Sequence, residues 1–168
     1  ARGPEIVVAD DAPRDVALVR DALAGHGGAH GRLATRKDEA LRRETAVVEG
    51  AGRTPVIVET ERVATSPLTR ALVRHAERGA PTTLVLAPAK RHSHAETRAL
   101  AALRAAGVTV REGGKNEKLA LAGDAAWVGS GNATGATGRN AAQLEWGLTT
   151  RIPALVRAIR RAVSRDAR

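Results

Sequence analysis

The sequence predicts an α/β fold: a single domain over residues 1–168, with a mixed, largely parallel central sheet flanked by helices. Short apolar runs alternate with amphipathic stretches of about 12 residues, which is typical of strands that alternate with helices. The chain of 168 residues is long enough to bury one sizeable core. No linker, internal repeat or low-complexity tract divides it, so we expect one domain.

In the first third of the chain, glycine, proline and aspartate residues separate the expected elements. Pro13 is typical of a first helical turn. We interpret the preceding Asp10 and Asp11 as an N-cap and its neighbour rather than as a metal or acid–base pair. Asp38 is expected to cap the next helix. The expected elements are a strand over 5–9, a helix over 13–24, a strand over 32–35, a helix over 38–48 and a strand over 55–59.

Serine residues mark the starts of the middle helices. Ser66-Pro67 begins a helix whose apolar face includes His75, which we expect in the core. Ser93 and Glu96 have the spacing of a capping box and begin a helix over 95–106. The remaining expected elements are strands over 82–87 and 108–110, a hairpin of strands 118–122 and 125–128 that turns at Gly123-Asp124, a strand over 143–150, and a last helix from Pro153 with Leu155, Ile159 and Val163 facing inward.

The composition excludes several classes of protein. Without cysteine there is no disulfide framework, thiolate zinc site or cysteine nucleophile. With Trp127 and Trp146 as the only aromatic residues, a base-stacking platform is nearly excluded, and we expect both in the core. No apolar run is long enough to span a membrane. The chain begins with Ala1 rather than Met, which leaves a processed N-terminus and either a secreted or a cytoplasmic location open.

The charge balance points to a polyanionic partner. The chain has 27 Lys and Arg against 18 Asp and Glu, a formal net charge of +9. Such an excess suits nucleic acid or an anionic lipid surface. A coding bias towards arginine explains the charge equally well, so charge alone does not decide between a partner and none.

The glycine-rich loop over 129–138 is the first candidate site. Its small residues leave backbone N–H groups free to hold phosphate. It is not a Walker A loop, because no Gly-Lys-Ser/Thr ends it, and its spacing does not fit a dinucleotide loop. No histidine, cysteine and carboxylate pattern predicts a metal site.

The residues around this loop are more specific. Asn116-x-Lys118 is followed by Asp124 and by Gly129-Ser130-x-Asn132. This run resembles the signature of the phospholipase D superfamily, H-x-K-x4-D-x6-G-S-x-N. Asp124 falls one position late, so we treat it as a structural partner.

Members of the family carry a Glu on the next strand. Glu145 fits that Glu within one or two positions, and Gln143 is the competing match. From Pro55 onwards the order of elements resembles the short, single-motif bacterial endonuclease branch, so the segment over 25–52 looks like an addition.

The resemblance implies a phosphodiesterase that needs neither metal nor cofactor. In the family one His attacks phosphorus and forms a phosphohistidine, and a second His protonates the leaving oxygen. The matching Lys118, Ser130 and Asn132 would hold the nonbridging oxygens. This chain has Asn116 at the position of the nucleophile, and an amide cannot attack.

Three explanations for Asn116 remain open: an engineered His→Asn change, a natural phosphate-binding protein without catalysis, or another His as the nucleophile. His92 and His94 are the candidates for the last, and with Lys90 and Arg91 they could contact a phosphate backbone.

The mechanism needs two motifs, and this chain has one. The resemblance therefore implies a homodimer with the site at its two-fold axis. We expect a nuclease, with DNA the favoured substrate. The alternatives are a lipid phosphodiesterase and a nucleic-acid-binding module without catalysis.

Overall fold

The computed structural model describes residue 9 and residues 11–166. The helices are α1 (Pro13–Leu23), α2 (Lys37–Glu49), α3 (Pro67–Glu77), α4 (His94–Ala105) and α5 (Pro153–Asp166), with a 3-10 turn, η1 (Gly138–Ala142). The strands are β1 (Ala29–His30), β2 (Leu33–Arg36), β3 (Val56–Thr60), β4 (Thr82–Leu86), β5 (Thr109–Glu112), β6 (Leu119–Ala122), β7 (Ala125–Gly129) and β8 (Leu144–Thr150). The strand expected over 5–9 falls on residues outside this description, apart from Ala9, which belongs to no strand.

The strands form one mixed sheet in the order β1-β2-β8-β7-β6-β3-β4-β5. The α/β class and the mixed sheet are confirmed, but the expectation of a largely parallel sheet is wrong. Among the described strands only β3–β4 and β4–β5 pair in parallel. The physical reason is the connections: helices α3 and α4 provide the crossovers that parallel pairs need, whereas a two-residue turn joins β6 to β7 and makes that pair antiparallel.

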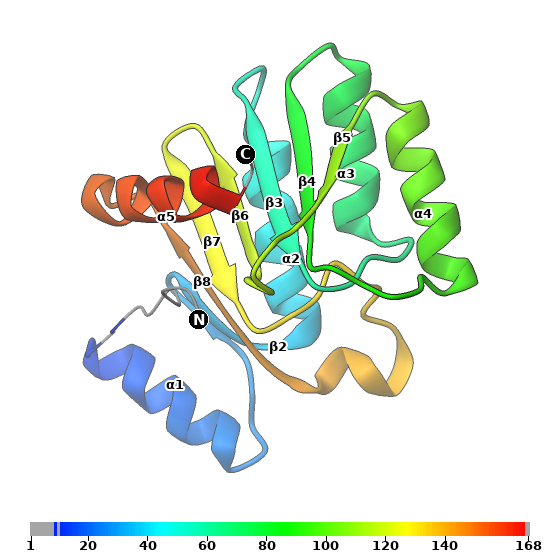
Figure 1. Ribbon diagram of the computed structural model, residues 1–168. Coiled ribbons are helices and arrows are strands. Elements are labelled where there is room, and N and C mark those ends of the chain that lie inside the picture. Colours follow the sequence, from blue (N-terminus) through cyan, green and yellow to red (C-terminus); the bar gives the residue numbers. More distant parts are fainter. Residues whose placement is uncertain (1–8, 10, 167–168) are drawn as a thin grey trace.

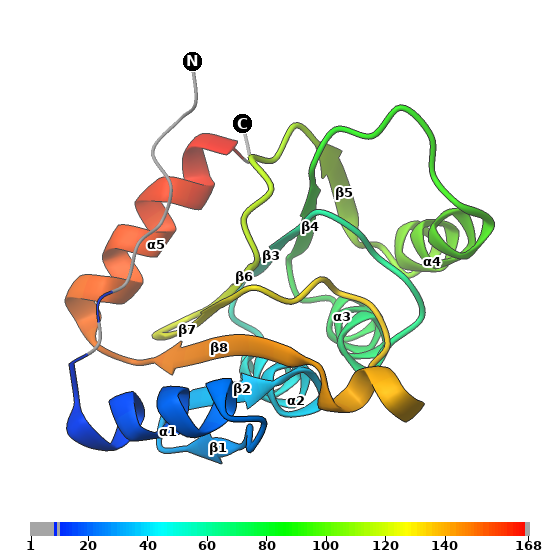
Figure 2. The ribbon, with the colours of Figure 1, turned by 90° about the horizontal axis from the view of Figure 1, so that it is seen from below.

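Helices cover both faces of the sheet. Helices α2, α3 and α4 pack on one face, and α5 packs on the other (Figures 1 and 2). Helix α1 lies on the same face as α5, near β1 and β2 at the edge of the sheet (Figure 2). The larger core cluster lies under α2, α3 and α4, and a smaller one under α5. In α5 the inward residues are Val156, Ile159 and Val163. Leu155, expected inside, is only half-buried.

The helix starts test the predicted caps. Ser93 forms the expected capping box with Glu96, and Ser66, expected to begin its helix, also forms a capping box, with Thr69 as the partner. The predictions that Asp11 lies at the cap of the first helix and that Asp38 caps the second are wrong, and Asp10 lies outside the described residues. Pro13 occupies the first turn of α1, so the N-cap is Ala12, which has no side-chain acceptor.

Helix α2 follows β2 without a loop. Its N-cap is therefore the extended Arg36, and Asp38 lies inside the first turn, where its carboxylate accepts a hydrogen bond from Glu39 N at 2.8 Å. An aspartate in the first turn still interacts favourably with the positive end of the helix dipole, although it does not cap the helix.

The two tryptophans behave differently. Trp127 is completely buried, as expected, and its ring lies against the backbones of Gly129 and Gly147. A Cβ at either glycine would come within 2.4 Å of the ring, so both positions require glycine. Trp146, expected in the core, is 44% exposed. It faces a groove between α1 and β8 rather than a packed interior. His75 is fully buried and contacts Thr82 Oγ1 through Nδ1 at 2.8 Å, so its core assignment is confirmed.

Candidate functional site

Strand pairing brings four separate segments to one edge of the sheet. Glu59 of β3 pairs with Leu119 of β6, and Leu119 pairs with Val128 of β7. Gly129 then pairs with Gly147 of β8. The segment after β3, the one before β6, the loop after β7 and the start of β8 therefore meet. This edge is also where the parallel strands β3 and β4 end, which is where α/β sheets commonly bind ligands.

Lys118 is held at this edge by three acceptors. Its Nζ lies 2.8 Å from Asn116 Oδ1, 3.0 Å from Asn116 O and 3.3 Å from Glu61 Oε2. The side chain is largely buried, whereas Glu61 is half-exposed. An ammonium group has three donors, so these three contacts engage all of them. Lys118 is thus fixed in position, and a ligand oxygen would exchange with one of these acceptors.

Asn116 adopts a left-handed backbone conformation, with φ of 72°. Among residues other than glycine, Asn, Asp and His are the ones enriched in this region. The backbone therefore suits the asparagine that is present, and it would also accept the histidine that the family has at this position. As an amide, Asn116 can donate a hydrogen bond to a phosphate oxygen but supplies no nucleophile.

Asn132 joins the glycine-rich loop to β3. Its Oδ1 accepts hydrogen bonds from Arg62 N at 3.2 Å and from Thr60 Oγ1 at 3.4 Å. Thr60 Oγ1 also accepts from Ala133 N at 3.1 Å. With the carbonyl oxygen engaged, the amide nitrogen of Asn132 is the part that makes no hydrogen bond within the described residues, so it can donate to a ligand.

Ser130 lies on the same loop and is exposed. Its Oγ accepts a hydrogen bond from Trp146 N at 3.1 Å, and its own N donates to Trp146 O at 3.0 Å. These contacts use the hydroxyl as an acceptor, so its proton can still be donated.

Glu145 lies directly against this loop. A Cβ at Gly131 would be 2.4 Å from Glu145 Oε2, so only glycine lets the carboxylate come this close. On the other side, Lys37 Nζ is 3.3 Å from Glu145 Oε1, and both side chains are mostly buried. Beneath them Glu44 of α2 is fully buried, and burial, followed by the nearby charge of Glu145, raises its pKa well above the ordinary value.

Sequence reasoning missed Lys37 and Glu44. Both lie in the segment over 25–52, which the motif does not include. The antiparallel pairing of β2 with β8 brings the start of α2 to Glu145. No local sequence pattern predicts a pairing between strands that lie more than 100 residues apart in the sequence.

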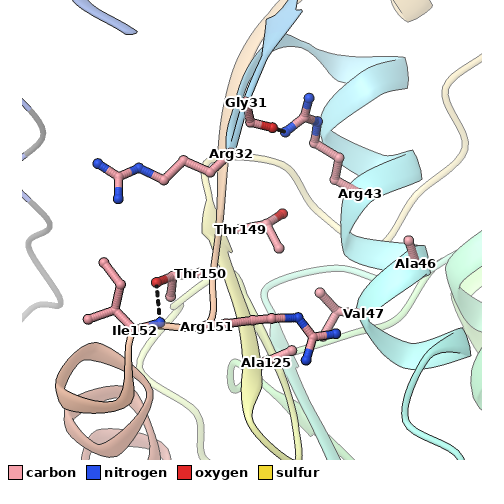
Figure 3. A pocket seen from close by; sticks show the side chains of 10 residues that line it. All are labelled: Gly31, Arg32, Arg43, Ala46, Val47, Ala125, Thr149, Thr150, Arg151 and Ile152. Atoms are coloured by element: carbon pink, nitrogen blue, oxygen red, sulfur yellow. Dashed lines mark hydrogen bonds between the residues drawn. The ribbon is translucent and has the colours of Figure 1, made fainter. Parts of the chain in front are cut away.

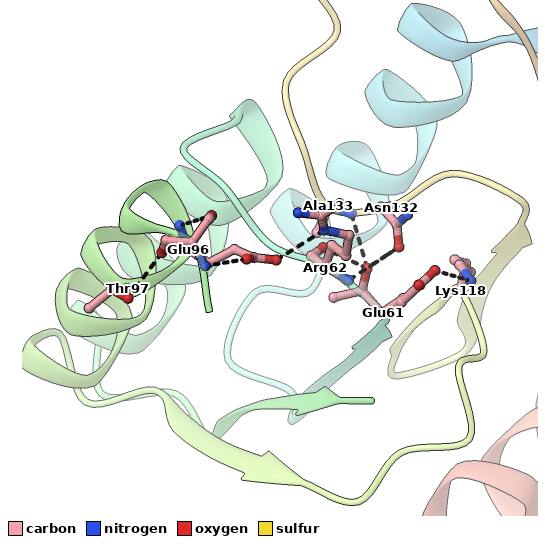
Figure 4. Close-up of polar contacts among 9 residues, drawn as sticks. Glu61, Arg62, Glu96, Thr97, Lys118, Asn132 and Ala133 are labelled. Atoms are coloured by element: carbon pink, nitrogen blue, oxygen red, sulfur yellow. Dashed lines mark hydrogen bonds and ion pairs between the residues drawn. The ribbon is translucent and has the colours of Figure 1, made fainter. Parts of the chain in front are cut away.

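Two further residues of the edge, Glu61 and Arg62, were also missed. Arg62 links the site to α4, with Nε 3.2 Å from Glu96 Oε1, and Glu61 contacts Lys118 (Figure 4). Their position in the sequence could have identified them, because they directly follow the buried strand β3. The carboxyl ends of such strands are where α/β sheets commonly bind ligands.

The remaining predicted residues lie elsewhere. Asp124 is in the turn at the far end of the β6–β7 hairpin, 80% exposed and paired with Arg151 at 2.6 Å. Strand β6 therefore separates it from Lys118, and it does not join the site. His92 contacts Glu112 Oε1 at 3.3 Å, and Lys90, Arg91 and His94 are exposed around the start of α4. They share the edge with Lys118, but no contact between them and Lys118 is found in the described part of the chain.

Neither a cluster of metal-binding side chains nor a membrane-spanning helix is present among the described residues. They contain no group of three or more His, Cys, Asp or Glu side chains arranged to hold a metal ion. None of the helices among them has the length and apolar character needed to cross a membrane.

Comparison with known proteins identifies the fold. No protein-family model and no curated protein matches the chain. Among solved structures it is similar to Nuc, a phospholipase D family member from Salmonella typhimurium, with a TM-score of 0.64 and 15% identity over 74% of this chain and 84% of that one. NucT from Helicobacter pylori gives 0.64 and 17% identity over 78% and 89%.

A third solved structure has a wider overlap. Polyphosphate kinase from Porphyromonas gingivalis gives a TM-score of 0.65 and 18% identity, covering 99% of this chain but only 30% of the kinase. The similarity of fold agrees with the signature around Lys118 and the Gly129–Asn132 loop, and the chain therefore has the phospholipase D fold.

Proposed function

We propose that this chain binds the phosphodiester backbone of nucleic acid at the edge formed by Asn116, Lys118, Ser130, Asn132 and Glu145. It does so as a protein of the phosphodiesterase or nuclease type. The observation that carries the proposal is the convergence of three kinds of donor, an ammonium, a hydroxyl and an amide, on one sheet edge beside a glycine-rich loop. Such a set of donors suits the nonbridging oxygens of a phosphodiester.

The chemistry requires a histidine at position 116. With it, imidazole attack on phosphorus would form a phosphohistidine as the bond from phosphorus to the leaving oxygen breaks, and water would then hydrolyse the phosphohistidine. Lys118 and Asn132 would stabilise the charge on the nonbridging oxygens. Glu145 would lie beside the reacting group as the fixed carboxylate of the site. Neither a metal nor a cofactor has a step in this scheme. With Asn116 the same pocket binds the backbone but does not cut it.

A homodimer completes the proposed site. Each chain supplies one motif, and the reaction needs a second imidazole for the leaving oxygen. Support comes from the apolar side chains exposed beside the site: Trp146, whose N contacts Ser130, and Leu144 on the same strand. Exposed apolar groups gathered next to polar site residues are typical of interaction surfaces.

Nucleic acid is favoured over lipid because the chain is short and strongly basic. A net charge of +9 on 168 residues suits a polyanion. DNA is the expected substrate, and lipid phosphodiesterase activity is the alternative enzyme function.

A binding function without catalysis is the second candidate. The observation that favours it is the bonding of Lys118 to both oxygens of Asn116, because the amide is then a built-in part of the site. In this case the chain recognises the backbone and leaves it intact.

The test is to restore the nucleophile. We expect Asn116→His to cleave DNA in the presence of EDTA, while the unchanged chain binds DNA without cleaving it. The same assay on RNA and on phospholipid vesicles separates the three functions. Cleavage of phospholipid alone would favour the lipid enzyme. No cleavage of any substrate, with DNA binding retained, would favour the binding module, and neither binding nor cleavage would contradict the proposal.

A further inference from the structure

A second basic pocket lies at the opposite end of β8 from the candidate site. It has a volume of about 500 Å³, within the range of small-ligand pockets, and opens between α2 and the ends of β7 and β8. Arg43 of α2 and Arg151 approach it from opposite ends, with Thr149 between them (Figure 3). Arg32 extends from the other side of the strand (Figure 3). We call Arg43, Thr149 and Arg151 the arginine pocket.

The arginine pocket contains an unsatisfied donor. Thr149 Oγ1 is buried and makes no hydrogen bond within the part of the chain that the structure describes. A buried hydroxyl without a partner is costly, so such groups in folded proteins usually have an acceptor, a water or a ligand. In this pocket the hydroxyl lies between two guanidinium groups, which favours an anionic acceptor.

The two arginines are held in different ways. Arg43 is mostly buried, and it donates from Nη1 to Gly31 O at 2.6 Å and from Nε to Glu39 Oε1 at 3.1 Å. It is therefore oriented before any ligand binds. Arg151 pairs with Asp124 at 2.6 Å, but both side chains are largely exposed. An exposed pair of this kind contributes at most about 1 kcal/mol, so Arg151 can exchange its carboxylate for another anion.

We infer that the arginine pocket binds a phosphate of the same nucleic-acid strand that occupies the candidate site. This inference rests on the proposed function. Guanidinium groups bind phosphate through paired N–H donors, and Thr149 adds a third donor. Glu145 and Thr149 lie about 13 Å apart along β8, on the face over which α2 packs. A backbone that contacts both sites therefore passes around the outside of α2, and since phosphates of one strand rise about 3.4 Å each along the duplex axis, a segment of several nucleotides is needed to join them.

The test measures binding of a fluorescein-labelled DNA duplex, longer than the separation of the sites, by the unchanged chain at several salt concentrations. Each phosphate contact contributes about 0.9 to the slope of log K against log salt. We expect Arg151→Gln to lower this slope by about that amount. Thr149→Val, which keeps the shape and removes the hydroxyl, should weaken binding about tenfold without lowering the melting temperature. Arg104→Gln, on α4 at the other edge of the sheet, removes the same charge and should leave both slope and affinity unchanged.

A parallel variant, Lys118→Ala, separates the two proposals. Weaker binding by Lys118→Ala together with unchanged binding by Arg151→Gln and Thr149→Val would overturn the arginine pocket alone. No DNA binding by the unchanged chain would overturn the proposed function and the arginine pocket with it. Equal losses in Arg151→Gln and Arg104→Gln would mean that net charge, not the pocket, determines affinity, and would also overturn the inference.

Discussion

The buried ring of Trp127 restricts one position on each of the neighbouring strands β7 and β8 to glycine. Its ring fills the space over positions 129 and 147, and the loop that holds Ser130 and Asn132 begins directly after the first of them. Gly129 belongs to the G-S-x-N part of the signature, and here its role is to make room for an indole. The packing of Trp127 thus gives a structural reason for glycine at this position of the motif.

We expect Gly129→Ala to lower the free energy of unfolding by about 1–3 kcal/mol, because the new methyl group clashes with the Trp127 ring and with Trp146 O. Urea denaturation measures the change. Gly135→Ala is the matched control, since its Cβ would be 3.6 Å from the nearest atom, an ordinary contact. Equal stability of the two variants would contradict this explanation of Gly129.

Glu44 makes the stability of the protein depend on pH. Burial raises the pKa of its carboxyl in the folded state. Between the ordinary pKa of glutamate and this raised value, the folded chain keeps a proton that the unfolded chain has released. The free energy of unfolding therefore falls as pH rises through this window, by at most about 1.4 kcal/mol per pH unit.

We expect Glu44→Gln to remove this fall, because an amide has no proton to release. The variant should gain stability over the unchanged chain as pH rises from acid to mildly alkaline values. Urea denaturation across this range measures the gain, with the exposed Glu77→Gln as control. A constant difference between Glu44→Gln and the unchanged chain at all pH values would show that Glu44 does not titrate in this window.

Helix starts illustrate what local sequence can and cannot predict. The Ser66 and Ser93 boxes follow from residues three apart, so the chain itself carries the whole signal. The start of α2 depends instead on where β2 ends, which the pairing with β8 determines. Elements with local signals were predicted within a few residues, whereas strand direction and helix caps that depend on tertiary contacts were not.

The capping box of α4 should contribute measurably to stability. Ser93 Oγ accepts from Glu96 N at 3.2 Å, and Glu96 Oε2 accepts from Ser93 N at 2.8 Å. We expect Ser93→Ala to cost about 1 kcal/mol of unfolding free energy, and Ser93→Asp, which keeps an acceptor, to cost much less. Thermal or urea unfolding measures both, and an equal loss in the two variants would argue against the cap.

In the candidate site, too, residues within a local sequence motif could be predicted, whereas residues brought in by tertiary contacts could not. The order of Lys118, Ser130, Asn132 and Glu145 could be predicted because the motif follows consecutive elements. Lys37 could not, since the pairing of β2 with β8 brings it in from a distant segment. The prediction that Asp124 lies at the site fails for a simpler reason. Asp124 belongs to the turn at the opposite end of the β6–β7 hairpin from Lys118.

As a whole molecule, the chain leaves apolar side chains exposed beside its candidate site. Val16, Val19, Leu23, Leu144 and Trp146 are all more than 40% exposed, and they line one groove between α1 and β8. The proposed homodimer would cover this groove next to Glu145. In that proposal the basic charge would bind the polyanion and the apolar groove would bind the second copy.

We expect the chain to be a dimer in solution, and Trp146→Asp to shift it to a monomer, because the charge would be buried without a partner in the interface. Size-exclusion chromatography with light scattering measures the mass of each. Ala101→Asp, exposed on α4, is the control and should remain dimeric. A monomeric unchanged chain would remove the shared site from the proposal.

In the proposed function, residue 116 occupies the position from which a nucleophile attacks phosphorus. The most direct measurement is intact-protein mass spectrometry of Asn116→His, mixed with a DNA oligonucleotide in EDTA and stopped within the first turnover. We expect a covalent nucleotide adduct in Asn116→His, none in the unchanged chain, and loss of the adduct when Lys118→Ala is added. DNA cleavage without an adduct, or an adduct that is unaffected by Lys118→Ala, would contradict it.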